Sequence, residues 1–320
     1  MTAEAAPAGA EATAASKESE LLSRDLAMQA TAVKYDLDVK TDRMRSTRQL
    51  VRLFFHLLKL VEIDLFVEAG AKDAASSRRA RRLLGDVRVV AFEANPYTYQ
   101  KFEGDNHRTG IEYLNLAATD TPGPVTFNVL RDDDGLPRSD GQSSILKRNR
   151  GRDTERGFEE VTVEGVRLDD FFAGQTFERA AVWMDVEGAC KFVLGGASDL
   201  LSKTAVLIIE VEDRSYWGDD HWLRERVVSH LYDAGLVPVA RDFEYEHQYN
   251  IVFVRASLMR SHPRLRLALT RFTSLAYGAR GIQPPSPSPQ PQVLSSRRMP
   301  EVVRRSRARI KGWLRAQDRA

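Results

Sequence analysis

The stretch FVEAGAKDA at residues 66–74 decides the fold, because an apolar run ends there at an acid and opens into a turn of small residues. The next apolar run, VRVVAF at 87–92, ends in the same way, with Glu93 directly after it. Between them, residues 75–85 have the composition of a helix that Gly85 closes. A strand, a helix and a strand in this order predict parallel neighbours in an α/β sheet, with both acids at one edge.

The same alternation continues along the chain. We expect helices at 45–62, from Asn95-Pro96, at 189–201 and at 219–235, and strands at 63–67, 88–92, 111–117, 179–186 and 205–212. A β-rich insertion with strands at 123–130 and 158–166 interrupts the series, and two strands within 236–256 close it as an antiparallel pair. The prediction is one α/β domain at 45–256 with a mostly parallel central sheet.

Tails of different composition flank this domain. Residues 1–44 have few large apolar side chains, which predicts a disordered N-terminal tail. Residues 257–300 read as a helical segment followed by a Pro-rich linker, and 301–320 as a basic amphipathic helix. From Arg255 onward the chain has 15 basic and 2 acidic residues, so its formal net charge of +2 conceals an acidic domain and a basic C-terminal tail.

Composition excludes several classes of protein. With 42% apolar and 29% charged residues, the chain is typical of globular proteins, and it has neither a membrane-spanning run nor a signal peptide. Its one cysteine, Cys190, excludes an internal disulfide, which fits the cytoplasm. The histidines lack metal spacing, so we expect no metal site. Basic and aromatic residues do not interleave, so we expect no nucleic-acid partner.

Two acids at adjacent strand ends suit a nucleoside cofactor, although an incidental acid in a turn remains the alternative. A dinucleotide site needs a glycine-rich G-x-G-x-x-G turn against its phosphates, but this loop has only Gly70 and begins with the negative charge of Glu68. S-adenosylmethionine has no phosphate and carries cationic groups. Glu93 could accept both ribose hydroxyls of either cofactor, so Glu68 and the missing glycines favour S-adenosylmethionine.

A second constellation, WMDVEGA at 183–189, follows a later strand. Asp185 and Glu187 should point to the same side, at the carboxyl edge where α/β sheets bind ligands. A carboxylate there could orient an acceptor hydroxyl or remove its proton, or it could simply cap a helix.

Several motifs in order, FVEAGA, AFEANP, GQSSIL, RLDDFF, WMDVEGA and LIIEVE, resemble the FkbM family of S-adenosylmethionine-dependent methyltransferases across roughly residues 63–215. The resemblance implies a class I (Rossmann-like) methyltransferase fold and O-methylation of a hydroxyl on a sugar, a glycan or a natural product. A nicotinamide-dependent oxidoreductase and a non-catalytic methyltransferase-like binding protein are the alternatives.

The expected site residues fall into two groups. Cofactor-binding residues would be Glu68, Gly70, Ala71, Glu93, Ala94, Asn95 and Ala117, and the acceptor would be oriented or deprotonated by Asp185, with Glu187 and Glu210 behind it. The chain departs from the family pattern at Glu68, Lys72, Ala74, Trp183 and Cys190. The acceptor would be a small molecule or glycan, and the C-terminal helix could associate weakly with an anionic membrane at the inner surface, or remain a solvated tail.

Overall fold

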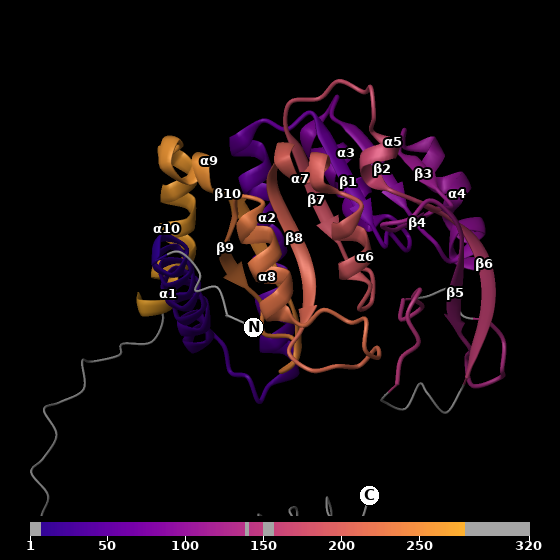
Figure 1. Cartoon of the computed structure of the whole chain (residues 1–320), viewed down its shortest axis with the longest axis horizontal. Helices are drawn as coiled ribbons and strands as arrows, with labels where there is room; N and C mark the ends of the chain where they lie inside the picture. Colours follow the sequence, from indigo (N-terminus) through magenta and orange to yellow (C-terminus); the bar gives the residue numbers. More distant parts are fainter. Residues whose placement is uncertain (1–7, 138–140, 150–156, 279–320) are drawn as a thin grey trace, which may run out of the picture. The chain divides into compact units, whose positions relative to one another are not determined.

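A seven-stranded sheet forms the centre of the computed structural model, which describes residues 8–137, 141–149 and 157–278 (Figure 1). The strand order is β3-β2-β1-β7-β8-β10-β9. The strands are β1 (Leu65–Ala69), β2 (Arg88–Phe92), β3 (Glu112–Leu114), β7 (Ala180–Met184), β8 (Thr204–Glu212), β9 (Leu236–Arg241) and β10 (Gln248–Arg255). Only β10 runs antiparallel to its neighbours, so the expected mostly parallel sheet with an antiparallel C-terminal pair is confirmed.

The chain reverses its direction of travel across the sheet between β1 and β7. Strands β2 and β3 extend the sheet on one side of β1, and β7 and β8 extend it on the other. The backbone of Glu68 lies between Ala91 and Trp183. Such a switch point opens a crevice at the carboxyl ends of the two central strands, which is where open α/β sheets bind ligands.

Helices cover both faces of the sheet, because successive side chains of each strand point to opposite faces and are apolar on both. On one face, side chains such as Val67 and Val182 pack with α5 (Leu168–Phe171), α6 (Cys190–Gly195), α7 (Ser198–Lys203) and α8 (Arg224–Asp233). On the other face, Phe66 and Ile208 pack with α2 (Lys40–Val61), α3 (Ala75–Leu84) and α4 (Pro96–Arg108). The expected helix at 189–201 is two short helices, since Gly196 and Ala197 end the first.

A smaller sheet adjoins the crevice, with the order β4-β6-β5. Its strands are β4 (Ala117–Ala118), β5 (Gly123–Leu130) and β6 (Phe158–Val166). This is the β-rich insertion that the sequence predicts. Its inner side chains, including Phe127 and Val129, form a separate small core with Ala94 and Tyr97. This core fixes the insertion beside the carboxyl end of β2.

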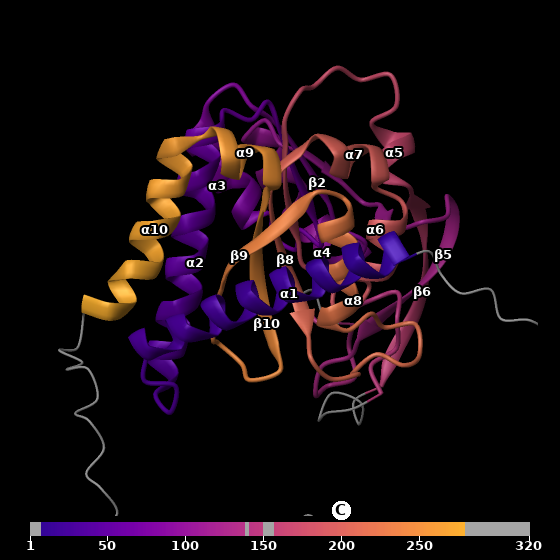
Figure 2. The ribbon, with the colours of Figure 1, turned by 60° about the vertical axis from the view of Figure 1, so that its left-hand side comes forward.

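The prediction of a disordered tail at 1–44 was wrong for residues 8–44. Helix α1 (Ala8–Ala30) and the short 3-10 helix η1 (Thr31–Lys34) precede α2, and α1 packs across β9 (Figure 2). Met28 is 4% exposed in the core, and Lys17 pairs with Asp233 at 2.6 Å. Helix α1 has few apolar side chains, and these contacts stabilise it against the rest of the domain.

The folded unit also continues beyond the expected boundary at 256. Helices α9 (Ala256–Ser261) and α10 (Pro263–Gly278) follow β10, and α10 lies beside α2 in both views (Figures 1 and 2). Leu265 is fully buried in the core. The Pro-rich linker and the basic C-terminal helix lie outside the described residues. Among the described residues, no helix is both long and apolar enough to cross a membrane.

Candidate active site

The loop after β1 is held against the end of β7. Gly70 and Ala71 donate their backbone N–H groups to the Phe92 carbonyl at 3.0 and 2.9 Å, and Asp185 N donates to the Ala69 carbonyl at 2.9 Å. Gly70 has φ +78°, and a Cβ there would lie 1.7 Å from the Asp185 carbonyl oxygen. Only glycine fits this approach, so Gly70 allows the first loop and Asp185 to share one crevice.

Glu93 lies at the end of β2, 7% exposed, and its carboxylate is fixed by two backbone donors. Lys72 N donates to Oε2 at 2.6 Å and Asn95 N to Oε1 at 2.7 Å. Burial raises its pKa to about 7. Asn95 is locked in turn, because its side chain caps α4 by accepting from Tyr97 N at 3.0 Å and from Thr98 N at 3.4 Å. Each Glu93 oxygen keeps a lone pair for a further donor.

A cavity of about 100 Å³ opens beside Glu93. Its apolar walls come from Phe92, Leu116, Phe127 and Ile145. The polar residues that line it are Lys72, Glu93, Asn95, Gln142, Ser143, Asp185 and Glu187. Of the expected cofactor-binding residues, Gly70, Glu93, Ala94, Asn95 and Ala117 line this cavity. Apolar walls beside a fixed carboxylate suit a flat base attached to a ribose.

Glu68 and Ala71 do not line the cavity. Glu68 is 3% exposed, and its carboxylate accepts Ser77 N at 2.8 Å at the start of α3, while burial raises its pKa to about 7. Ala71 is 3% exposed in the core on the α2 face. Both residues hold the first loop and α3 in place, and their contact with a cofactor stays a prediction.

Three carboxylates converge at the carboxyl ends of β7 and β8. The structure brings Asp185, Glu187 and Glu210 together, with one oxygen of each within 4.8 Å of the others. Gln142 N donates to Glu187 Oε1 at 3.1 Å, whereas Oε2 is buried and has no hydrogen-bond partner within the described part of the chain. Gln248 Nε2 donates to Glu210 at 2.9 Å. Neither Asp185 nor Glu187 acts as a side-chain cap of α6.

Burial separates the protonation states within this cluster. It raises the pKa of Asp185 to about 6 and, with the charge of Asp185, that of Glu187 to about 8; the Glu210 pKa lies well above its ordinary value. Asp185 therefore loses its proton at a lower pH than Glu187 does. Three carboxylate oxygens are also ligands that Mg²⁺ or Ca²⁺ accepts, and the expected absence of a metal stays a prediction.

An aromatic loop after β8 closes one side of the carboxylate cluster. Trp217 is 2% exposed and packs on Gly188, where a Cβ would lie 2.2 Å from the indole ring. Glu212 accepts from Trp217 Nε1 at 3.3 Å and lies 3.1 Å from His221 Nε2. His221 thus faces a carboxylate behind the site rather than the cavity itself.

Most of the residues at which the chain departs from the FkbM sequence pattern lie outside the cavity. Trp183 packs against Phe54 and Phe55, with ring centroids 5.6 and 6.3 Å away, and Ala74 is buried at the start of α3. Cys190 is buried, with Sγ 3.4 Å from the Glu210 carbonyl. Only Lys72 lines the cavity, where its charge lowers the pKa of both Glu93 and Asp185 against the effect of burial.

Sequence reasoning missed several residues of the site. Phe127, Gln142, Ser143 and Ile145 come from the insertion and reach the cavity only through the packing of the smaller sheet. The GQSSIL motif at 141–146 carried the signal, since it stood among the ordered motifs without an assigned role.

This strand order, with a crevice at the carboxyl ends of β1 and β7 and an acidic residue at the end of each strand, is that of a class I methyltransferase. The chain belongs to the FkbM methyltransferases, because residues 66–269 match the model of the methyltransferase FkbM domain. The cofactor of this class is S-adenosylmethionine.

Among known relatives, a 2-O-methyltransferase, NoeI, of Sinorhizobium fredii (strain NBRC 101917 / NGR234) is 25% identical over 183 residues, covering 55% of this chain and 73% of that protein. The chain is also similar to methyltransferase FkbM from Methylobacillus flagellatus KT, with 14% identity and a TM-score of 0.39, over 59% of this chain and 43% of the other. The N-terminal domain of EvdMO1 has 12% identity and a TM-score of 0.37, over 66% of this chain and 79% of that domain.

Proposed function

We propose that this methyltransferase transfers the methyl group of S-adenosylmethionine to a hydroxyl oxygen of a sugar, a glycan or a natural product. The observation that carries the proposal is the position of Asp185, which lines the same cavity as Glu93. In this proposal Asp185 serves as the acid-base group, next to the residue that would hold the cofactor ribose. The description of the relative as a 2-O-methyltransferase supports the same class of acceptor.

The residues present fit the cofactor. Glu93 offers two oxygens to the ribose hydroxyls, and Phe92, Leu116 and Phe127 offer apolar surface to the adenine. Oε2 of Glu187 is buried without a hydrogen-bond partner among the described residues, so it can still bond to a polar group of a ligand.

The reaction requires a hydroxyl oxygen aligned with the methyl carbon and a place for its proton. S-adenosylmethionine supplies a methyl group on a sulfonium, which leaves as a neutral thioether. Asp185, ionised at neutral pH, accepts the hydroxyl proton as the oxygen–carbon bond forms. Glu187, whose pKa is raised to about 8, lines the same cavity and can donate a hydrogen bond to the acceptor, whereas Glu210 does not line the cavity and lies behind the other two carboxyl groups.

Labelled cofactor tests this proposal. We expect the purified chain to transfer a radiolabelled methyl group to glycans or small molecules of a cell extract, yielding ether-linked methyl groups that resist mild base. Label in base-labile methyl esters or on nitrogen would refute methylation of a hydroxyl group while leaving methyl transfer intact. Cofactor binding without any transfer would favour the non-catalytic alternative.

A further inference from the structure

A second and larger hollow lies away from the candidate active site, between α2 and α10. We call it the α2–α10 groove; its volume is about 660 Å³ and it shares no residue with the cavity beside Glu93. Both helices lie at one side of the molecule, next to each other in each ribbon view (Figures 1 and 2). The methyl transfer described above leaves this groove without a role.

The groove combines an apolar floor with a cationic rim. The floor is made by Leu53, Leu60, Ala268 and Phe272, and Leu267 stands at its edge with 49% of its surface exposed. The rim carries five cations: Lys34, Arg45, Arg52, Arg264 and Arg271. No aspartate or glutamate is among the described residues that line it.

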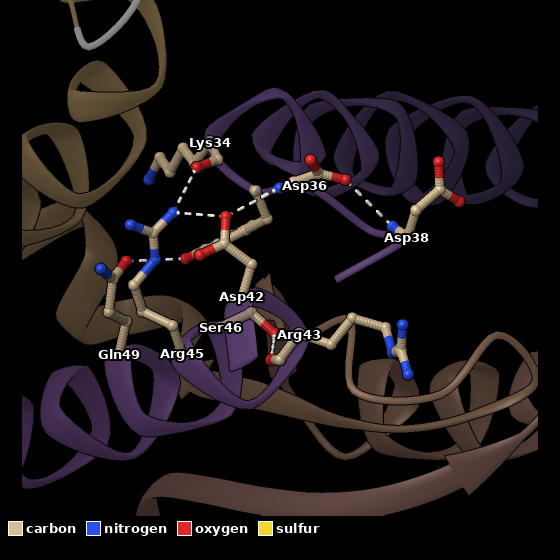
Figure 3. Close-up of polar contacts among 9 residues, drawn as sticks. Lys34, Asp36, Asp38, Asp42, Arg43, Arg45, Ser46 and Gln49 are labelled. Carbon is tan, nitrogen blue, oxygen red and sulfur yellow. Dashed lines mark hydrogen bonds and ion pairs between the residues drawn. The ribbon is translucent and has the colours of Figure 1, made fainter. Parts of the chain in front are cut away.

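The five cations are not equally available to a ligand. At one end, Arg45 pairs with Asp42 at 2.9 Å and donates to the Lys34 carbonyl at 2.8 Å (Figure 3). The Lys34 ammonium donates to the Phe272 carbonyl, and burial lowers its pKa. These two residues are therefore committed to the structure.

Three arginines remain for an external anion. Arg52, Arg264 and Arg271 are exposed, and none forms an ion pair with an acid in the part of the chain that the structure describes. Arg52 projects from α2, and the other two from α10. Between Ala256 and Gly278 the chain has four arginines and no acid, so nothing along α9 and α10 offsets this charge.

We infer that the α2–α10 groove binds anionic phospholipid of a membrane surface, with the three arginines on the phosphate and the apolar floor against an acyl chain. A bilayer offers both chemistries at one place, and each basic residue adds to the attraction of its anionic leaflet. Residues 279–320 do not suit the groove, because they carry 10 basic and 2 acidic residues. Their charge has the same sign as the rim and would favour the same surface.

Vesicle sedimentation of the full-length chain tests this inference. The probes are vesicles of phosphatidylcholine alone and of phosphatidylcholine with phosphatidylglycerol. We expect the wild type to pellet only with the anionic vesicles and to be released by salt. The triple variant Arg52→Gln/Arg264→Gln/Arg271→Gln should partition on the order of a hundredfold less, from the loss of three basic residues at the surface.

Matched variants separate the groove from overall charge. The control Arg82→Gln/Arg108→Gln/Arg226→Gln removes three exposed arginines from α3, α4 and α8, and should keep most of the binding. Leu267→Ser should weaken binding without a change of charge. Equal losses of vesicle binding in the two triple variants would show that binding depends only on net charge, which would contradict a binding site in the groove. Unchanged partitioning of the variant with three groove arginines replaced would show that another part of the chain binds the membrane. Binding of the wild type to polyglutamate but not to vesicles would indicate an acidic protein partner. Either result contradicts the inference.

Discussion

Replacing Glu93 by glutamine should weaken cofactor binding and destabilise the fold through two separate effects. Glutamine keeps one acceptor oxygen, so at least one charge-assisted bond to a ribose hydroxyl is lost, at about 1.5–3 kcal/mol. This corresponds to a fall of roughly 10- to 150-fold in affinity for S-adenosylmethionine. The amide group also faces one of the two backbone N–H groups that now donate at 2.6 and 2.7 Å, which should lower the free energy of unfolding by about 1–3 kcal/mol.

Isothermal titration with S-adenosylmethionine and urea unfolding measure these two quantities on the same preparation. The control is Glu178→Gln, at an exposed position between α5 and β7, which should change neither. Titration is done below the unfolding transition, so that a lower affinity does not reflect unfolded protein. An unchanged affinity together with a lower stability would show that Glu93 only holds the loop, and would refute its assignment to the ribose.

Three further perturbations test the geometry of the site. Gly70→Ala should lower the free energy of unfolding by more than about 3 kcal/mol, measured by urea unfolding, because its Cβ would overlap the Asp185 carbonyl. Gly104→Ala, at an exposed position of α4 with open space around it, should leave the free energy of unfolding unchanged or raise it by up to about 1 kcal/mol, and similar losses in the two variants would contradict the close approach. Asp185→Asn should keep cofactor affinity and lower turnover by roughly 10²–10⁴, and full turnover would remove Asp185 as the base. The pKa of Glu187 is raised from 4.5 to about 8 in the folded chain. Between these pH values the folded chain therefore holds a proton that the unfolded chain has released, and the stability that this group contributes is lost as pH rises. The unfolding free energy of the wild type relative to Glu187→Gln should therefore fall over this range by at most about 1.4 kcal/mol per pH unit, and parallel pH curves would refute the raised pKa.

The sequence was sufficient for most of the central sheet. In the central sheet β2, and in the smaller sheet β5 and β6, begin and end where the sequence patterns predict, because turn residues and acids bound these strands. Asn95 followed by Pro96 marks the start of α4 for a local reason, an N-cap with proline at the first helical position. Gly70 and Glu93 could likewise be found from their places at strand ends.

Features that depend on tertiary contacts could not be found in this way. Helix α1 has too few apolar groups to be recognised, and packing against β9 holds it. The split of residues 189–201 into α6 and α7 follows from Gly196, where a Cβ would lie 2.1 Å from the Thr119 carbonyl. Gln142 reaches Glu187 from 45 positions away in sequence. The orientation of Glu68 toward Ser77 depends on which face of β1 the α3 helix covers.

The most direct test of the central claim is mass spectrometry of the products formed from S-adenosylmethionine and a glycan-containing cell extract, with the wild type and Asp185→Asn side by side. We expect the wild type to form a product one methylene unit heavier than its acceptor, with the new methyl group on an oxygen, and the variant to form much less of it. Equal product from both proteins would contradict the role of Asp185. No methylated product from a wild type that binds the cofactor would contradict the methyl transfer itself.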